Sequence, residues 1–280
     1  MRVSHKTWLV GGVALLMIAG CQGKTDVSAT AGAEPEWESI FDGKTLNGWT
    51  PKISMEPVGQ DKDKTFEVVD GTIRVSYEGY DEFGDRFGHL FYKDKLSHYR
   101  LKLEYRFFGE QLVGGASWAN VNSGVMLHSQ SPESIELDQK FPISVEGQFL
   151  GVLPDNSPRT TANVCTPGTN VVVDGKIETE HCIQTAIPVR PLGEWVQYEV
   201  EVLGNGTIKQ LVNGQPTFEF SGAQYDPSDK RLTDLKNANA MMENGLAISD
   251  GYIALQAESA PVEFRNIQLM RLDTDNAGGH

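Results

Sequence analysis

Alternation of apolar and polar residues is the dominant pattern of this chain, and two neighbouring runs show it most clearly. In residues 143–150 Ile143, Val145 and Phe149 fall on one face of a predicted strand. Glu146 and Gln148 fall on the other face, together with Ser144 and Leu150. In residues 125–129 Val125 and Leu127 fall on one face of a predicted strand, and His128 falls on the other. If these strands are neighbours in one sheet, Glu146, Gln148 and His128 share a surface. We expect the chemistry of the protein on that surface.

Two tight turns are predicted by dipeptides that accept a positive φ angle. Asp70-Gly71 lies inside the β-prone residues 66–75, and Asn213-Gly214 separates residues 208–212 from residues 217–220. Each dipeptide therefore predicts a β-hairpin.

The same alternation recurs in residues 99–108, 196–203 and 251–270. In the last of these the apolar parity slips between Phe264 and Ile267, which predicts a bulge at Arg265-Asn266. Only residues 223–245 are expected to be helical or irregular. Eight or more strands with almost no helix predict an all-β sandwich, and no composition break suggests a second domain.

The first 20 residues combine a basic start with an apolar run that is too short to span a membrane, as in a bacterial secretion signal. Ile18-Ala19-Gly20-Cys21 resembles a lipobox, so Cys21 is the predicted lipidation site; an ordinary signal with a chance cysteine is the alternative. Residues 21–36 are then the lipidated cysteine and a small, polar tether. The folded domain is expected over residues 37–273, followed by a tail at 274–280. We expect a lipid-anchored protein of the cell envelope, at the outer membrane and facing the periplasm or the surface.

Two cysteines remain besides Cys21. In an exported chain Cys165 and Cys182 predict a disulfide. A metal pair that includes His181 is the alternative, but no Cys-x-x-Cys spacing supports it.

The charge balance argues against one class of partner. The chain has 24 Lys and Arg against 38 Asp and Glu, for a formal net charge of −14, and no basic cluster. Nucleic acid is therefore not an expected partner.

Several short motifs together resemble a known family. They are FDGKTLNGW at 41–49, NSGV at 122–125, EGQ at 146–148, GEW at 193–195, NG at 213–214 and VEFRNI at 262–267. Over residues 37–272 the chain resembles the 3-keto-disaccharide hydrolase domain family, once called DUF1080. The resemblance implies a concanavalin A-like jelly roll, with two antiparallel sheets and a sugar cleft on the concave face. Two positions depart from the family pattern: His128 stands where Arg is common, and Gly151 where Asp is frequent.

The resemblance also implies a reaction. A 3-keto group acidifies the hydrogen at C2, so one base can remove it and the C1 substituent can leave by β-elimination. We expect Glu146 or His128 to be that base. A divalent metal held by the same two residues would be one way to stabilise the enolate, although no cofactor is required by the sequence.

Four further residues are expected to bind the sugar. Asn122, Gln148 and Arg265 are candidates for holding hydroxyl groups or the enolate oxygen, and Trp118 is the candidate for stacking on a sugar ring. A conventional glycosidase needs two carboxyl groups, and only Glu146 stands out in the sequence.

Three functions remain open at this point. The first is an exported enzyme that cleaves 3-keto-disaccharides or 3-keto-glycosides by proton abstraction at C2, β-elimination and hydration, which is net hydrolysis. The second is a carbohydrate-binding lipoprotein without catalytic activity. The third is a structural or interaction domain of the cell envelope.

Overall fold

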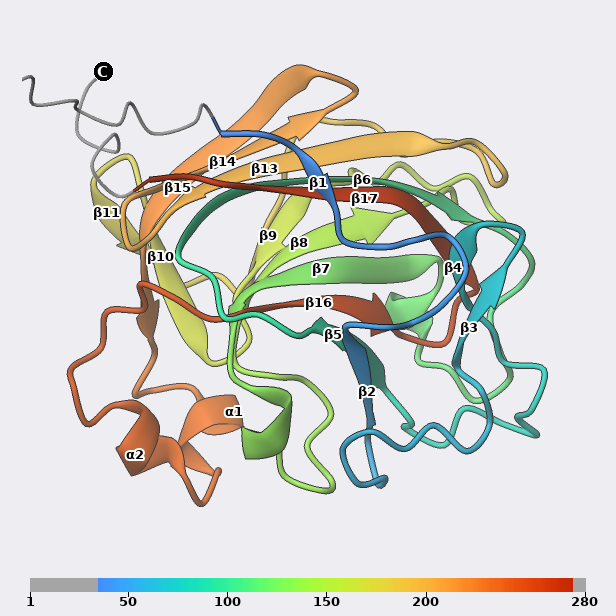
Figure 1. The fold of residues 1–280 in the computed structure, drawn as a ribbon, viewed down its shortest axis with the longest axis horizontal. Coiled ribbons are helices and arrows are strands. Elements are labelled where there is room, and N and C mark those ends of the chain that lie inside the picture. The colour runs from blue at the N-terminus through green and yellow to red at the C-terminus, as the bar shows by residue number, and fades with distance from the viewer. Residues whose placement is uncertain (1–34, 274–280) are drawn as a thin grey trace, which may run out of the picture. The chain divides into compact units, whose positions relative to one another are not determined.

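A computed structural model describes residues 35–273 of the chain, and these residues form two antiparallel β-sheets that face each other (Figure 1). The predicted all-β, two-sheet sandwich is confirmed. The predicted signal, Cys21 and most of the tether lie outside the described residues, as does the C-terminal tail. Within residues 35–273 no helix is long and apolar enough to cross a membrane.

The larger sheet has ten strands in the order β11-β10-β15-β14-β13-β6-β17-β4-β3, with β1 also paired to β17. Its strands are β1 (Glu38–Ser39), β3 (Phe66–Val69), β4 (Thr72–Val75), β6 (His98–Phe107), β10 (Thr169–Val173), β11 (Lys176–Glu178), β13 (Val196–Leu203), β14 (Thr207–Val212), β15 (Gln215–Tyr225) and β17 (Val262–Arg271).

The smaller sheet has seven strands in the order β12-β9-β8-β7-β16-β5-β2. They are β2 (Trp49–Ile53), β5 (Gly88–Tyr92), β7 (Asn122–Ser129), β8 (Val145–Leu150), β9 (Asn163–Cys165), β12 (Cys182–Ile183) and β16 (Tyr252–Ala257). Short helical turns are η1 (Ser117–Ala119), η2 (Pro132–Ser134), α1 (Lys230–Thr233) and α2 (Ala238–Met241). Both α turns fall in the segment expected to be helical or irregular.

The turns and the bulge occur where the sequence predicts them. Asp70 and Asn213 have φ angles of 49° and 50°, and the glycine after each also has a positive φ. They connect β3 to β4 and β14 to β15 as tight hairpins. In β17 the register shifts between Arg265 and Gln268, which confirms the predicted bulge.

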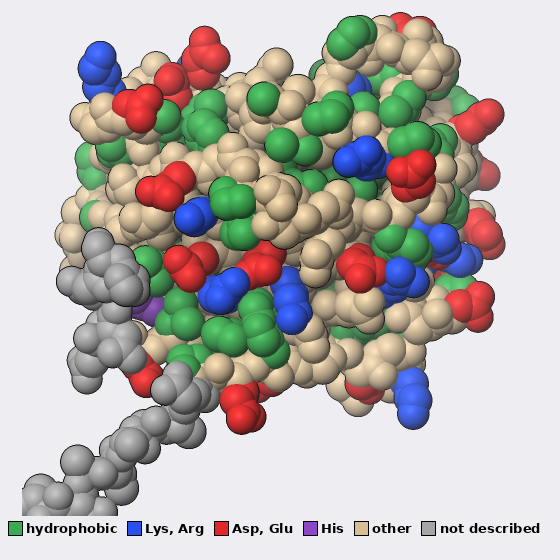
Figure 2. All heavy atoms as spheres, turned by 90° about the horizontal axis from the view of Figure 1, so that it is seen from above, with side chains coloured by type: hydrophobic (Ala, Val, Ile, Leu, Met, Phe, Trp, Pro, Cys, Tyr) green, Lys and Arg blue, Asp and Glu red, His purple; other side chains and the backbone are tan. Residues whose placement is uncertain are grey.

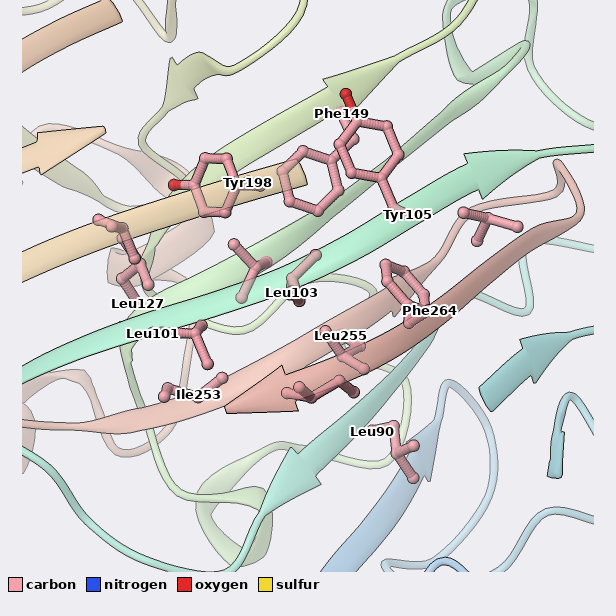
Figure 3. Packing of buried hydrophobic residues seen from close by; sticks show 14 of the residues in the cluster. Leu90, Leu101, Leu103, Tyr105, Leu127, Phe149, Tyr198, Ile253, Leu255 and Phe264 are labelled. Carbon is pink, nitrogen blue, oxygen red and sulfur yellow. The ribbon is translucent and has the colours of Figure 1, made fainter. Parts of the chain in front are cut away.

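Aliphatic and aromatic side chains fill the space between the two sheets (Figure 3). Phe149 of the seven-stranded sheet stacks on Tyr105 with ring centres 4.1 Å apart, and its edge contacts Tyr198 at 4.8 Å. The Tyr198 hydroxyl donates to Gln210 Oε1 at 2.6 Å, so the polar tip of this buried ring is satisfied. A Cβ at Gly147 would collide with that hydroxyl, which explains why β8 carries glycine there. This packing fixes the face of β8 that points away from the core.

Charged side chains of both signs cover the outer face of the ten-stranded sheet (Figure 2). Glu263 pairs with Arg74 and Arg106 at 2.7 Å each. Arg265 pairs with Glu104 at 2.6 Å and lies 3.9 Å above the ring of Trp195. Neighbouring charges therefore neutralise one another on this face, although the chain as a whole is acidic.

A loop covers the middle of the outer face of the seven-stranded sheet, the face that corresponds to the concave face implied by the family resemblance. Ile135, at the end of η2, packs with Phe91, Met126 and Ala254 in an apolar cluster separate from the main core. Only part of the concave face is therefore open to a ligand.

A disulfide ties β12, an edge strand of the seven-stranded sheet, to its neighbour β9. Cys165 in β9 and Cys182 in β12 are directly opposite in register and are joined. Between them the chain crosses to the ten-stranded sheet, forms β10 and β11, and returns. The disulfide therefore closes a loop that connects both sheets.

Replacing both of these cysteines by serine is expected to lower the free energy of unfolding by about 3 kcal/mol. The sequence separation is 17 residues, and removing the cross-link restores the entropy of that loop in the unfolded chain. Urea unfolding of the oxidised protein and of the double variant measures the difference. Unfolding curves that coincide would show that the disulfide contributes no stability.

Candidate functional site

Glu146 and Gln148 of β8 line a pocket of about 440 Å³ on the concave face of the seven-stranded sheet. Val145 and Phe149 of the same strand lie in the core, so the predicted alternation of this strand is confirmed. Gln148 Oε1 accepts a hydrogen bond from Asn163 Nδ2 at 3.0 Å. The NH₂ group is the end of Gln148 that remains to donate to a ligand.

Glu258 supplies a second carboxyl group to the same pocket. It follows β16, and its side chain is buried, with 2% of the residue exposed against 6% for Glu146. Its position was missed at the sequence level, because residues 257–261 look like a turn. The available signal was its parity: Ala254 lies on the concave face, and Glu258 is four positions further along the chain, so a regular strand places both on the same face.

Burial changes the acidity of both carboxyl groups. It raises the pKa of Glu146 to about 8, since the carboxylate loses hydration. Burial raises the pKa of Glu258 well above its ordinary range, and the negative charge of Glu146 raises it further. Two nearby carboxyl groups cannot easily ionise together, so Glu146 loses its proton first and Glu258 remains an acid.

Gly124 of β7 makes room for the Glu146 side chain. A Cβ built at Gly124 would lie 2.5 Å from Glu146 Oε1 and 2.9 Å from Glu146 Cγ. The carboxyl group of Glu146 therefore leans over the neighbouring strand, in the gap that the missing side chain leaves. This approach explains the glycine of the NSGV motif.

Asn122 stands at the start of β7 and lines the same pocket. It follows Val121, whose φ of 48° is strained for a β-branched residue. Val121 O accepts a bond from Gly151 N at 3.0 Å, and the Asn120 carbonyl accepts one from Arg159 at 2.7 Å. A Cβ at Gly151 would lie 2.5 Å from Val121 Cγ1, so glycine at 151 is required for this backbone to place Asn122.

Aromatic rings form one wall of the pocket. Trp118 is 55% exposed and lies parallel to Phe87, with ring centres 6.0 Å apart and an angle of 3° between their planes. Phe141 contacts Phe87 at 4.6 Å and also lines the pocket. An exposed aromatic face of this kind suits the C–H face of a sugar ring.

The opposite wall comes from the disulfide and its surroundings. Cys165 is the register partner of Glu146, so the disulfide lies beside the carboxyl group. His181 and Arg231 complete this wall. Burial and the Arg231 guanidinium lower the pKa of His181, so this imidazole is neutral at pH 7.

The structure does not bring His128 to this pocket, and the expectation that it shares a surface with Glu146 is wrong. His128 has a φ of 49°, and the pairing of β7 with β16 shifts register at this point. The irregularity turns its side chain away, so that Nε2 donates to the Gly204 carbonyl at 2.9 Å. His128 lines a different pocket, with Tyr252 and Asp250.

Arg265 also lies elsewhere. It belongs to β17 of the ten-stranded sheet, where Glu104 and Trp195 hold its side chain on the outer face. The expectation that Arg265 contacts the ligand of Glu146 is therefore not met, because the two residues are on different sheets.

The predicted metal pair does not form, because Glu146 and His128 line separate pockets. Within residues 35–273 no group of three or more His, Cys, Asp or Glu side chains has the arrangement of a metal site. Glu146, Glu258 and the amide oxygen of Asn122 are the oxygen atoms available to a cation at this pocket.

The fold and the pocket define a class of protein: a two-sheet β-sandwich with a cleft on its concave face. A Bacillus subtilis protein of unknown function with a galectin-like fold has this architecture; it matches with a TM-score of 0.50 and 10% identity, over 81% of this chain and 90% of that one. The likeness shows the fold alone.

The chain belongs to the 3-keto-alpha-glucoside-1,2-lyase-like domain family, whose sequence model matches residues 36–270. It is also similar to a 3-keto-disaccharide hydrolase of Bacteroides thetaiotaomicron, with 26% identity over 265 residues that cover 84% of this chain and 78% of that protein. The family predicted from the sequence motifs is therefore confirmed.

Proposed function

We propose that this protein cleaves 3-keto-disaccharides or other 3-keto-glycosides by elimination followed by hydration. The observation that carries the proposal is the pair of buried carboxyl groups, Glu146 and Glu258, in one pocket with unequally raised pKa values. Membership of the family and the similarity to a 3-keto-disaccharide hydrolase support the substrate class.

The first step needs a base and an acid. The Glu146 carboxylate removes the proton from C2, which the neighbouring ketone acidifies, and the electron pair forms the enolate. The C1–O bond then breaks, and the protonated Glu258 gives its proton to the leaving oxygen. The products are an alcohol or sugar and a 1,2-unsaturated 3-keto sugar; Glu146 is left protonated and Glu258 ionised.

Hydration is the same sequence in reverse, with water in place of the alcohol. The oxygen of the water molecule bonds to C1 while the Glu258 carboxylate accepts one of the water protons. Glu146 then returns a proton to C2. Both carboxyl groups then have their initial protonation. Neither step requires an oxidant or a reductant.

The amide groups have a separate task. The NH₂ of Gln148 and the side chain of Asn122 point into the pocket and can donate to the enolate oxygen at C3, where negative charge develops. Trp118 offers its face to the sugar ring.

The acidity of the pair favours this route over ordinary glycoside hydrolysis. A conventional retaining or inverting glycosidase keeps one of its two carboxyl groups ionised at neutral pH, as nucleophile or as base for water. In this pocket burial raises the pKa of Glu146 to about 8 and raises the pKa of Glu258 well above its ordinary range. A base with a pKa of about 8 suits removal of a carbon-bound proton near neutral pH.

The experiment is turnover of 3-keto-trehalose and 3-keto-glucosides beside the same sugars without the ketone, each with and without EDTA. We expect release of the leaving group from the keto sugars alone. Loss of activity with EDTA would add a metal to the site. Cleavage of unoxidised sugars would overturn the elimination route, and binding without cleavage would favour the carbohydrate-binding alternative.

A further inference from the structure

Buried polar atoms without a hydrogen-bond partner gather in the pocket and on the neighbouring strands β16 and β5. Among the described residues eleven such side-chain atoms occur, and six belong to one patch of the concave face. They are His89 Nε2, Asn122 Oδ1, Glu146 Oε1, Gln256 Nε2, Gln256 Oε1 and Glu258 Oε2. Buried polar groups are normally satisfied, so a group of six in one place marks a site where solvent or a ligand supplies the bonds.

Gln256 and His89 extend this patch beyond the acid–base pair. They are register partners in β16 and β5, and they lie on the same face as Ala254 and Phe91, the next residues of equal parity. Each is at most 2% exposed. Gln256 is two residues before Glu258, so the two side chains lie about 7 Å apart along one face of the chain.

The cover over this patch is aromatic. The His89 ring lies 6.3 Å from the ring of Phe141, which also lines the pocket of Glu146. Burial and, to a smaller extent, the charge of Lys52 lower the pKa of His89 to about 3, so its imidazole stays neutral and acts only as a hydrogen-bonding group. An amide and a neutral imidazole, both buried and without partners, have the chemistry of a site for one water molecule.

We propose that Gln256 and His89 hold the water molecule that hydrates the unsaturated intermediate, so that this chain completes hydrolysis instead of stopping as a lyase. The proposal rests on the proposed function. The water oxygen bonds to C1, the Glu258 carboxylate takes one water proton, and Glu146 returns a proton to C2. Gln256 is thereby a positioning residue for the second step and has no part in the first.

The test separates the two steps. A 3-keto-glucoside is supplied first, and then the isolated 1,2-unsaturated 3-keto sugar, whose conjugated carbonyl is followed by ultraviolet absorption. For Gln256→Leu we expect release of the leaving group at close to the wild-type rate, with the unsaturated sugar accumulating. Hydration should fall about tenfold or more, the effect of losing one or two hydrogen bonds to the reacting water. In ¹⁸O-labelled water the wild-type product should carry the label at C1.

Two further variants serve as a second test and as a control. His89→Leu should change the product ratio in the same direction, and Gln197→Leu, at an exposed position of the outer face, should not change it. The melting temperature of Gln256→Leu should stay close to that of the wild type, because the amide and the water molecule that satisfies it are lost together.

Each other outcome has a meaning. A rise in KM with an unchanged product ratio would show that Gln256 binds the sugar, and the inference would be wrong. A wild-type protein that releases the unsaturated sugar without hydrating it would also overturn the inference, while leaving the elimination intact. No release of the leaving group from any keto sugar would instead refute the proposed function.

Discussion

Replacing Glu146 by glutamine is expected to lower kcat/KM on 3-keto-glycosides by about 10²- to 10⁴-fold, the usual contribution of a general base. The amide is similar in shape but cannot accept the C2 proton. The wild-type kcat/KM should rise between pH 6 and pH 8, as Glu146 ionises with a pKa of about 8, and should fall at higher pH when Glu258 loses its proton. Initial rates across this pH range measure both limbs.

The same variant is expected to change the pH dependence of stability. The pKa of Glu146 is about 8 in the folded protein against 4.5 for the exposed group, so the folded state holds a proton that the unfolded chain releases. This stabilisation is complete below about pH 4 and is lost as the pH rises to 8, at roughly 1.4 kcal/mol per pH unit. Glu146→Gln removes this part of the slope and should be the more stable protein at pH 8.

Urea unfolding at pH 5, 7 and 9 tests this expectation, with Glu243→Gln as the control because Glu243 is exposed.

The variant Glu258→Gln should lose the alkaline limb of the pH–rate profile, since the amide cannot protonate the leaving oxygen. Wild-type turnover by Glu146→Gln would remove Glu146 from the reaction.

Replacing Gly124 by alanine is expected to lower kcat about 100-fold, the effect of a misplacement of about 1 Å in a catalytic group. The added Cβ would lie 2.5 Å from Glu146 Oε1 and 3.1 Å from Glu146 Cδ, so the carboxyl group must move. Gly124 does not have a positive φ, so alanine fits the backbone. The melting temperature should therefore change little while turnover falls.

A double-variant cycle shows whether Gly124 acts through Glu146. If it does, Gly124→Ala adds almost nothing to the loss already caused by Glu146→Gln. Independent, additive losses would mean that the new methyl group blocks the sugar itself.

Local alternation predicts strands and faces well wherever the strand is regular. The orientation of Glu146 and Gln148, both hairpins and the bulge in β17 could be read from the sequence because each depends on a few neighbouring residues. His128 could not be placed in this way. His128 itself has a positive φ near the end of β7, and this irregularity turns its side chain to the face opposite to the one that alternation predicts. The residue types around it do not indicate the irregularity.

Which distant strands pair with one another could not be predicted from the sequence. Arg265 is polar and lies at a bulge, which are features of a site residue, but its strand belongs to the other sheet. Glu258 is the opposite case, a site residue in a segment that resembles a turn. The register of β16 against β7 brings it into the same pocket as Glu146. Both errors concern which strands are neighbours, and this is decided by the packing of the whole sandwich.

The loop that carries Ile135 over the concave face restricts the length of molecule that the protein can accept. A polymer bound through its middle needs a groove that is open at both ends, and here Ile135, Phe91 and Met126 close the path across the sheet. The same loop continues to Phe141, which is part of the pocket wall. We therefore expect a sugar to reach Glu146 with one of its chain ends. On this expectation the protein would favour short glycosides and terminal residues, and its binding to a glycan would scale with the number of chain ends and not with chain length.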